Sequence, residues 1–233
     1  MSTSPQLSII MPVLNEAATI EAALAALQPH RARGTEIIVV DGGSSDGTRA
    51  RAQAGADIVV TASRGRAAQM NAGAAHARRE ILLFLHADTQ LPQNADGLIA
   101  KGLASSGRQW GRFDVRITGG PLLALIGMLM NIRSRMTGIA TGDQAIFVTR
   151  DAFHAALGFP QIALMEDIAF SARLKRLGRP LCLTERVTTS GRRWHKHGVL
   201  PTVFLMWRLR LAYFLGTEPA VLARRYGYAP PEG

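Results

Sequence analysis

Short apolar runs alternate with segments of helical pattern over about the first 90 residues, and this alternation is the strongest constraint on the fold. The helical segments are 16–27, expected to be capped by Asn15, a segment starting near Thr48, and 67–77. The apolar runs are four to six residues long, the first is expected to stop at Pro12, and they lie at 7–11, 36–40, 57–60 and 80–85. Apolar strands separated by helices are typical of a parallel sheet, so the sequence predicts an α/β fold with a mostly parallel wound sheet flanked by helices.

Four loops follow these four runs, at 12–16, 41–48, 64–66 and 86–88. In a wound parallel sheet, ligands bind beyond the carboxyl ends of the strands. We therefore expect the four loops to lie on one edge of the sheet and to form the binding site.

The second half of the chain is less regular. An apolar segment occupies 121–131, a strand is expected at 144–148, and a helix is expected to start after Met165 and end at Gly178. The longest uncharged stretch, 117–132, has 16 residues, which is short of the roughly 20 that a membrane-spanning helix needs. The sequence therefore predicts no transmembrane segment.

The C-terminal segment 199–215 has the pattern of a basic amphipathic helix. Arg208 and Arg210 interrupt a run rich in large apolar residues. One helical face carries Phe204, Trp207, Leu211 and Phe214 or Leu215. This face either packs against the core, which is the default, or lies on an anionic membrane surface, where segment 121–131 could join it.

Several functional classes are excluded by missing residues. No Gly-x-Gly-x-x-Gly follows the first run, and no Gly-x-x-x-x-Gly-Lys-Ser/Thr occurs. The sequence therefore lacks the main motif of dinucleotide-binding oxidoreductases and that of P-loop NTPases. The single cysteine, Cys182, can form neither an intramolecular disulfide nor a Cys-x-x-Cys zinc site, and it fits a reducing compartment. Because Met1–Gln6 carries no secretory pattern, the expected location is the cytoplasm, including the inner face of its membrane.

The chain is strongly basic, with 27 Lys and Arg against 17 Asp and Glu, a formal net charge of +10. Most of the basic residues are arginine, whose planar guanidinium pairs with phosphate and carboxylate oxygens. The charge therefore predicts a polyanionic partner, which could be nucleic acid, a nucleotide diphosphate or an anionic lipid surface.

Two acidic residues follow predicted strands directly. Asp41 is either the first residue of an Asx turn or an acceptor for a nucleobase or ribose. Asp88 either caps the next element or contacts a divalent cation that bridges two phosphates. His86 would share a face with Asp88 in an extended chain and could reach the same metal; otherwise it is a satisfied, half-buried histidine.

Two further segments carry candidate groups. Glu166 and Asp167 open the expected helix after Met165, where acidic residues either cap the helix or remain ionised to serve as a general base. Arg66 and Gln69 follow the third run, and there they either contact a phosphate or a base or simply begin a solvated helix. The segment 189–197 is either a solvated basic loop or a clamp on a departing diphosphate.

Five motifs then occur together in one order and spacing: Pro12–Glu16, Asp41–Thr48, Gln69–Gly73, Phe84–Asp88 and Glu166–Asp167. With them the chain resembles the family-2 glycosyltransferases of the GT-A fold, over about residues 7–177. Gly65–Asn71, the His-Ala-Asp form of the metal motif and Gly142–Gln144 look like the bacterial branch labelled arsenosugar-biosynthesis glycosyltransferase.

The resemblance implies roles in binding a nucleotide-diphosphate donor, most commonly a UDP-sugar. Asp41 would hold the base or ribose, Arg66 would approach the base or diphosphate, and Pro12, Leu14 and Glu16 would line the nucleotide pocket. Arg193 is similar to the arginine of a Gln-x-x-Arg-Trp motif of processive synthases, but Ser190 stands at the glutamine position, which argues against processivity.

The resemblance also implies a metal-dependent, inverting transfer of a hexosyl group to an acceptor hydroxyl. Asp88 would contact Mn²⁺ or Mg²⁺, and His86, which replaces the first Asp of the metal motif, and His195 are further candidate ligands. Asp167, next to Glu166, would be the general base. The acceptor would be a small molecule or a lipid.

The expected organisation is a glycosyltransferase domain over 1–198 and a helical extension over 199–233. Within the domain, residues 7–90 would form the nucleotide half and residues 91–198 the acceptor half. Two alternatives remain at this stage: a nucleotide-sugar-binding protein without transferase activity, and a basic nucleic-acid-binding protein, for which the net charge is the only argument.

Overall fold

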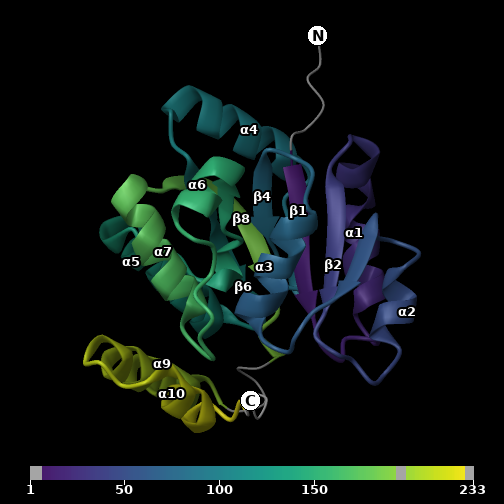
Figure 1. Ribbon diagram of the computed structural model, residues 1–233. Coiled ribbons are helices and arrows are strands. Elements are labelled where there is room, and N and C mark those ends of the chain that lie inside the picture. Colours follow the sequence, from purple (N-terminus) through teal and green to yellow (C-terminus); the bar gives the residue numbers. More distant parts are fainter. Residues whose placement is uncertain (1–6, 193–197, 229–233) are drawn as a thin grey trace.

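Four parallel strands form one half of the sheet in a computed structural model, which describes residues 7–192 and 198–228 (Figure 1). Their order is β3-β2-β1-β4, and each pair of neighbours is parallel. They are β1 (Leu7–Val13), β2 (Glu36–Asp41), β3 (Ile58–Thr61) and β4 (Ile81–Phe84). These are the four strands that the apolar runs predict.

The other half of the sheet is mixed. The complete order is β3-β2-β1-β4-β7-β6-β8-β5; β6 and β8 are parallel, whereas β7 is antiparallel to both of its neighbours and β5 to β8. These strands are β5 (Thr89–Gln90), β6 (Trp110–Ile117), β7 (Phe147–Thr149) and β8 (Leu181–Thr189). Parallel pairings are therefore the majority, and of these four strands only β7 coincides with a strand expected from the sequence.

Helices cover both faces of the sheet. One hydrophobic cluster joins the sheet to α1 (Ile20–Ala32), α4 (Ala95–Ser106) and α5 (Pro121–Thr137). The opposite cluster joins it to α3 (Arg66–His76), α6 (Arg150–Ala155) and α7 (Glu166–Leu177). The short α2 (Thr48–Ala52) follows β2, and a 3₁₀ turn spans Gly142–Gln144.

The last two helices, α9 (Val199–Phe214) and α10 (Pro219–Arg225), lie side by side beneath the sheet (Figure 1). They share a small apolar cluster in which Leu209 and Leu222 pack with Met165 and Ile168, at the start of α7. Through this cluster the C-terminal helices are attached to the end of the sheet where the carboxyl ends of β1–β4 lie.

Two local predictions near the first strand are wrong. Pro12 does not end β1. Its nitrogen, which has no hydrogen to donate, faces the β4 side of the strand, and β4 pairs with β1 only as far as Ile10. No hydrogen bond to β4 is therefore lost at Pro12. Asn15 does not cap α1, which begins at Ile20 after Thr19. Instead Asn15 has a φ of 54°, and its side chain accepts a hydrogen bond from the Ser45 N–H.

The default prediction that the apolar face of 199–215 packs on the core is also wrong. Phe204, Trp207, Leu211, Phe214 and Leu215 are all exposed, and Trp207 retains 68% of its accessible surface. The opposite side of α9 packs inward, with Thr202 and Leu209 buried.

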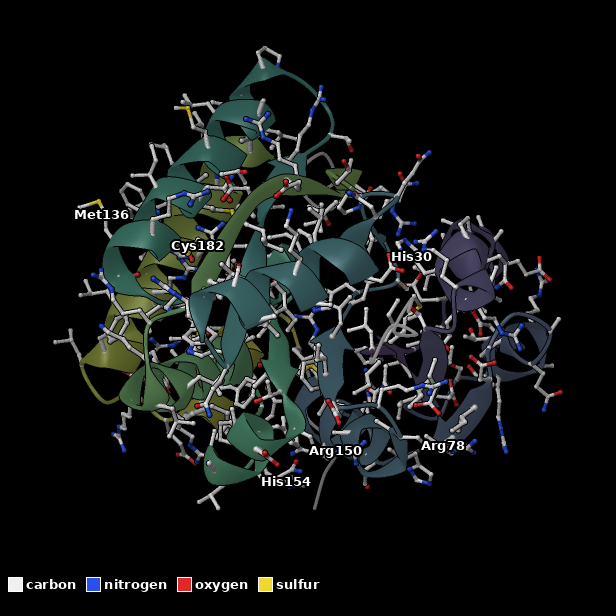
Figure 2. All side chains as sticks on the ribbon, turned by 90° about the horizontal axis from the view of Figure 1, so that it is seen from above. His30, Arg78, Met136, Arg150, His154 and Cys182 are labelled. Carbon is white, nitrogen blue, oxygen red and sulfur yellow. The ribbon has the colours of Figure 1, made fainter. Side chains whose placement is uncertain are left out.

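Helix α5 also exposes a row of apolar side chains. One side of the helix, which includes Leu123 and Gly127, is buried against β6. Met136, near its end, points away from the molecule (Figure 2) and is 76% exposed. The other exposed members are Leu122, Leu125, Met128, Leu129 and Ile132. Within the two described segments, no helix combines the length and hydropathy needed to cross a membrane.

Candidate active site

A cavity of about 860 Å³ lies at the carboxyl ends of β1 and β4. Its walls come from the segments that follow these two strands, from the first turns of α3 and α7, and from the C-terminal helices. Nine predicted site residues line it: Pro12, Leu14, Glu16, Arg66, Gln69, His86, Asp88, Glu166 and Asp167. Asp41 does not line it, and Arg193 and His195 lie outside the described residues.

The main role of loop 41–48 is to hold the loop after β1 in place by hydrogen bonds. The Thr48 hydroxyl accepts a hydrogen bond from the Glu16 N–H at 2.8 Å, and the Asp46 carboxylate accepts one from the Ala17 N–H at 3.0 Å. These bonds hold the backbone after β1 in place. The side chain of Glu16 is thereby presented to the cavity from a fixed backbone.

Asp41 forms the Asx turn that its Asp-Gly-Gly-Ser sequence predicts. Its Oδ2 accepts hydrogen bonds from the Gly43 and Ser44 N–H groups at 3.1 and 3.0 Å. Its Oδ1 is buried and has no hydrogen-bond partner among residues 7–192 and 198–228. One oxygen therefore shapes the turn, while the other is an acceptor that the described residues do not use.

Gln69 connects the ends of two strands. Its Nε2 donates to the carbonyl oxygens of Val13 and Val40, both at 2.8 Å, and its side chain is buried. Both hydrogen bonds that the Gln69 amide nitrogen can donate therefore go to the backbone. Gln69 lines the cavity, but its clearest role is to hold β1 and β2 at the floor of the site.

The segment after β4 turns instead of continuing as a strand. The Thr89 N–H donates to the His86 carbonyl at 3.0 Å, so the expected extended geometry that would place His86 and Asp88 on one face is wrong. Both residues still line the cavity, and Asp88 is exposed there. His86 lies against Gly142, where an added Cβ would come within 2.6 Å of the imidazole ring, and its Nδ1 is 3.5 Å from an oxygen of Asp143.

Asp167 is held in place at the first turn of α7. Its Oδ2 accepts a hydrogen bond from the Gly142 N–H at 2.9 Å, and its Oδ1 accepts one from the Ile168 N–H at 2.7 Å. The side chain is partly exposed and faces the cavity. A carboxylate fixed in this way can accept a proton from a group bound in front of it.

Glu166 has a different environment, although it is the next residue. Only 6% of its surface is accessible, and burial raises its pKa; the charge of Asp167 adds to this, while Arg66 opposes it. For Arg66, desolvation works against the charged form, but attraction to Glu166 and the neighbouring acidic groups raises its pKa overall. Part of the Arg66 side chain remains open to the cavity, where water screens this attraction.

The C-terminal helices supply residues that the sequence analysis did not assign to the site. Thr202, Met206 and Arg210 line the cavity from α9, and segment 226–228 lines it after α10. Arg210 Nε is buried and has no hydrogen-bond partner within the described parts of the chain. No local feature of the sequence indicates this role, because in the sequence Arg210 only interrupts an apolar run. Arg192 also lines the cavity.

The cavity offers few side chains that could bind a metal ion. Among the described residues there is no group of three or more His, Cys, Asp or Glu side chains suited to hold a metal ion. Asp88 and His86 nevertheless face the same cavity as Arg66 and Arg192. This arrangement fits a cation that takes its remaining ligands from a bound diphosphate and water, as Mg²⁺ commonly does.

The sequence profile described as Glycosyl transferase family 2 matches residues 8–122, which include β1–β4 and the segment His86–Asp88. No curated protein matches the sequence significantly.

Solved structures with a similar fold are numerous. The mannosyltransferase PcManGT from Pyrobaculum calidifontis, in complex with GDP-Man and Mn²⁺, is 24% identical with a TM-score of 0.65, over 99% of this chain and 67% of that one. S. aureus TarS 1–349 with UDP-GlcNAc is 17% identical with a TM-score of 0.66, over 79% and 58%. Glucosyl-3-phosphoglycerate synthase from Mycobacterium tuberculosis, with Mn²⁺, UDP-Glc and phosphoglyceric acid, is 21% identical with a TM-score of 0.59, over 78% and 70%. The likeness establishes the fold, and this chain spans between 58% and 70% of these three chains.

Proposed function

Residues 8–122 belong to glycosyl transferase family 2, and from this we propose that the protein transfers a sugar from a nucleotide-diphosphate donor to an acceptor hydroxyl. The observation that carries the proposal is the meeting of Asp88, Arg66 and Asp167 in one cavity. They come from the end of β4, the start of α3 and the start of α7, and they combine an anion-binding side with a fixed carboxylate.

The donor nucleotide would enter the cavity beside the end of β1, where Pro12, Leu14 and Glu16 line it. Asp41, at the end of the neighbouring β2, does not line the cavity; its Oδ1, which has no hydrogen-bond partner among the described residues, supports its proposed role as acceptor for a base or ribose group. The three similar structures contain GDP-Man, UDP-GlcNAc and UDP-Glc, so donors with both bases are candidates, with UDP favoured by the sequence resemblance.

Mn²⁺ or Mg²⁺ is the proposed cofactor, and Asp88 with His86 would hold it. When bound, the metal would neutralise charge on the diphosphate. Arg66 and Arg192 are cationic side chains of the same cavity and would stabilise the same developing charge. Arg193 and His195, predicted to contact the diphosphate and the metal, lie outside the described residues and stay predictions.

Asp167 is the proposed general base. Its carboxylate would take the proton of the acceptor hydroxyl while the hydroxyl oxygen bonds to the anomeric carbon and the bond from that carbon to the diphosphate oxygen breaks. A single displacement of this kind inverts the anomeric centre. Glu166 would act beside it by keeping Arg66 in position.

Calorimetric titration tests the donor site. UDP and GDP, each with and without Mn²⁺, are titrated into wild type and Asp88→Ala. We expect micromolar binding of one nucleotide, strengthened by metal, and loss of that strengthening in the variant. If neither nucleotide binds under any condition, the proposed function is wrong.

Asp167→Asn tests the base. The amide has the size of the carboxylate and can accept one of its two backbone hydrogen bonds, but it cannot take a proton. We therefore expect transfer to fall by about 10²- to 10⁴-fold with nucleotide affinity almost unchanged. The matched control is Asp151→Asn, which changes an exposed aspartate in the first turn of α6 and should leave transfer intact.

The alternative of a sugar-nucleotide-binding protein without activity is favoured by one observation, the histidine at position 86 where the metal motif has an acidic residue. It predicts nucleotide binding without turnover, so that no catalytic readout changes in Asp167→Asn. A panel of UDP- and GDP-sugars with wild type separates the two functions directly.

A further inference from the structure

The outer side of α9 carries a continuous apolar row. Leu200, Phe204, Trp207, Leu211 and Phe214 recur at helical spacing and are each 61–71% exposed, and Leu215 follows at 78%. Isolated exposed apolar residues are common, but a row of six large side chains on one helix face is a typical interaction surface. We call this row the outer face of α9.

The inner side of the same helix faces the proposed active site. Met206 and Arg210 line the cavity, and Leu209 is buried in the cluster that α9 and α10 share with the start of α7. One side of α9 therefore lines the cavity and packs on the start of α7. The other side, the outer face, is not covered by any other described part of the chain. In Figure 1 these helices form the lower edge of the molecule, at the opposite end from α4.

The charges of the C-terminal helices α9 and α10 are almost all positive. Arg208 is exposed, and its guanidinium lies 5.7 Å from the centre of the Phe204 ring. Arg224 and Arg225 are exposed on α10, and from 199 to 228 the only acidic residue is Glu218. Aromatic and aliphatic side chains bordered by arginines are the composition of helices that lie in the headgroup region of anionic membranes.

We propose that the outer face of α9 docks on an anionic lipid surface. A second copy of the chain is a poorer partner, because a symmetric contact through this face would bring together two positively charged C-terminal helix pairs, in which Glu218 is the one acidic residue between 199 and 228. Lipid headgroups supply the negative charge and the acyl region accepts Phe204, Trp207 and Leu211. Docking is independent of the proposed function, since binding to vesicles requires neither donor nor acceptor.

Vesicle binding of the full chain tests this proposal. The probes are vesicles of phosphatidylcholine alone and of phosphatidylcholine with about 30% phosphatidylglycerol, at low salt and at about 0.5 M salt. We expect co-sedimentation with the anionic vesicles that weakens at high salt, and on the order of tenfold weaker binding in Trp207→Ser. The matched control is Leu157→Ser, which removes an 81% exposed leucine beyond α6 and should bind like wild type.

Tryptophan fluorescence locates the contact. With Trp194→Phe as background, emission comes only from Trp110, which is 1% exposed, and Trp207. We expect anionic vesicles to shift the emission to shorter wavelength and brominated acyl chains to quench it, and both effects to disappear when Trp207→Phe is added.

Three results would overturn the proposal: no binding to anionic vesicles, equal binding of Trp207→Ser and wild type, or a wild-type dimer in solution that Trp207→Ser converts to monomer. The last result would assign the outer face to self-association. Failure of nucleotide binding alone would count against the proposed function and leave the docking surface intact.

Discussion

Glu166 and Asp167 are consecutive carboxylates with opposite surroundings. Asp167 is partly open and held by two backbone N–H groups, whereas Glu166 is buried beside Arg66. Adjacent residues on a helix point about 100° apart, so one can face the cavity while the other faces the protein interior. Their chemistry follows from this difference and not from their residue types.

Replacing Glu166 should reveal its raised pKa as a pH-dependent stability. The folded state holds the Glu166 proton more tightly than the unfolded chain, so the free energy of unfolding of wild type falls as pH rises from the ordinary value of 4.5 through the raised pKa. Glu166→Gln lacks this loss. We expect the unfolding free energy of the variant minus that of wild type to increase with pH, by about 1.4 kcal/mol for each unit of the shift.

Urea unfolding at several pH values between 4 and 8 measures this difference. Glu185→Gln, which removes an exposed carboxylate on β8, is measured beside it as a matched control for the loss of one Glu side chain. A pH-independent difference for Glu166→Gln would show that its pKa is not raised.

At the scale of elements, α3 approaches the sheet closely because of one glycine. A Cβ at Gly73 would lie 2.4 Å from Ile10 Cγ2 and 2.9 Å from Val40 Cγ2, on β1 and β2. Helix α3 therefore packs close to these two strands. Its first turn places Arg66 and Gln69 at their carboxyl ends. The position of two site residues depends on this small contact.

Gly73→Ala should destabilise the protein by about 1–3 kcal/mol, since overpacking outweighs the gain in helix propensity. Gly97→Ala is the matched control: it lies in α4 with nothing within 4 Å of an added Cβ, and should stabilise by about 0.5–1 kcal/mol. Urea unfolding of both variants measures the two effects. Equal stability of the two variants would contradict the packing argument.

At the scale of the whole molecule, the site is closed by helices that are attached through a small cluster. Leu209 and Leu222 of α9 and α10 pack on Met165 and Ile168 in this small cluster, and at the start of α9 Val199 packs against one large cluster of the sheet. The C-terminal helices can therefore open without unfolding of the sheet.

Leu222→Ala should loosen these helices selectively. Truncation of a fully buried leucine removes about 2–5 kcal/mol of packing, and here the loss falls on the C-terminal cluster. We expect amide hydrogen exchange to accelerate across 199–228 and to change little in β1–β4. Leu83→Ala, in a large cluster, should instead accelerate exchange throughout, and the same pattern in Leu222→Ala would show that the chain opens as one unit.

The first half of the fold follows from local sequence, because β1–β4 are runs of nearly continuous apolar residues, and β1, β2 and β4 are mostly buried. Strands β6 and β8 do not have this character. Arg112 of β6 is fully buried, and it is tolerated because Ser134 and the Asn131 carbonyl of α5 accept its hydrogen bonds and Asp114 pairs with it. The middle of β8, around Glu185, is exposed. Neither strand could be identified without its neighbours.

The local sequence predicts that the segments after β1 and β4 and the start of α3 meet at one edge of the sheet, since the carboxyl ends of parallel strands share that edge. It also determined that α9 has an apolar face, because helical periodicity is a local property. Only the tertiary structure decided that this face points outward, that Arg210 enters the cavity, and that Asp167 is held by Gly142. Periodicity identifies the side of a helix, whereas its contacts depend on the packing of segments far apart in the chain.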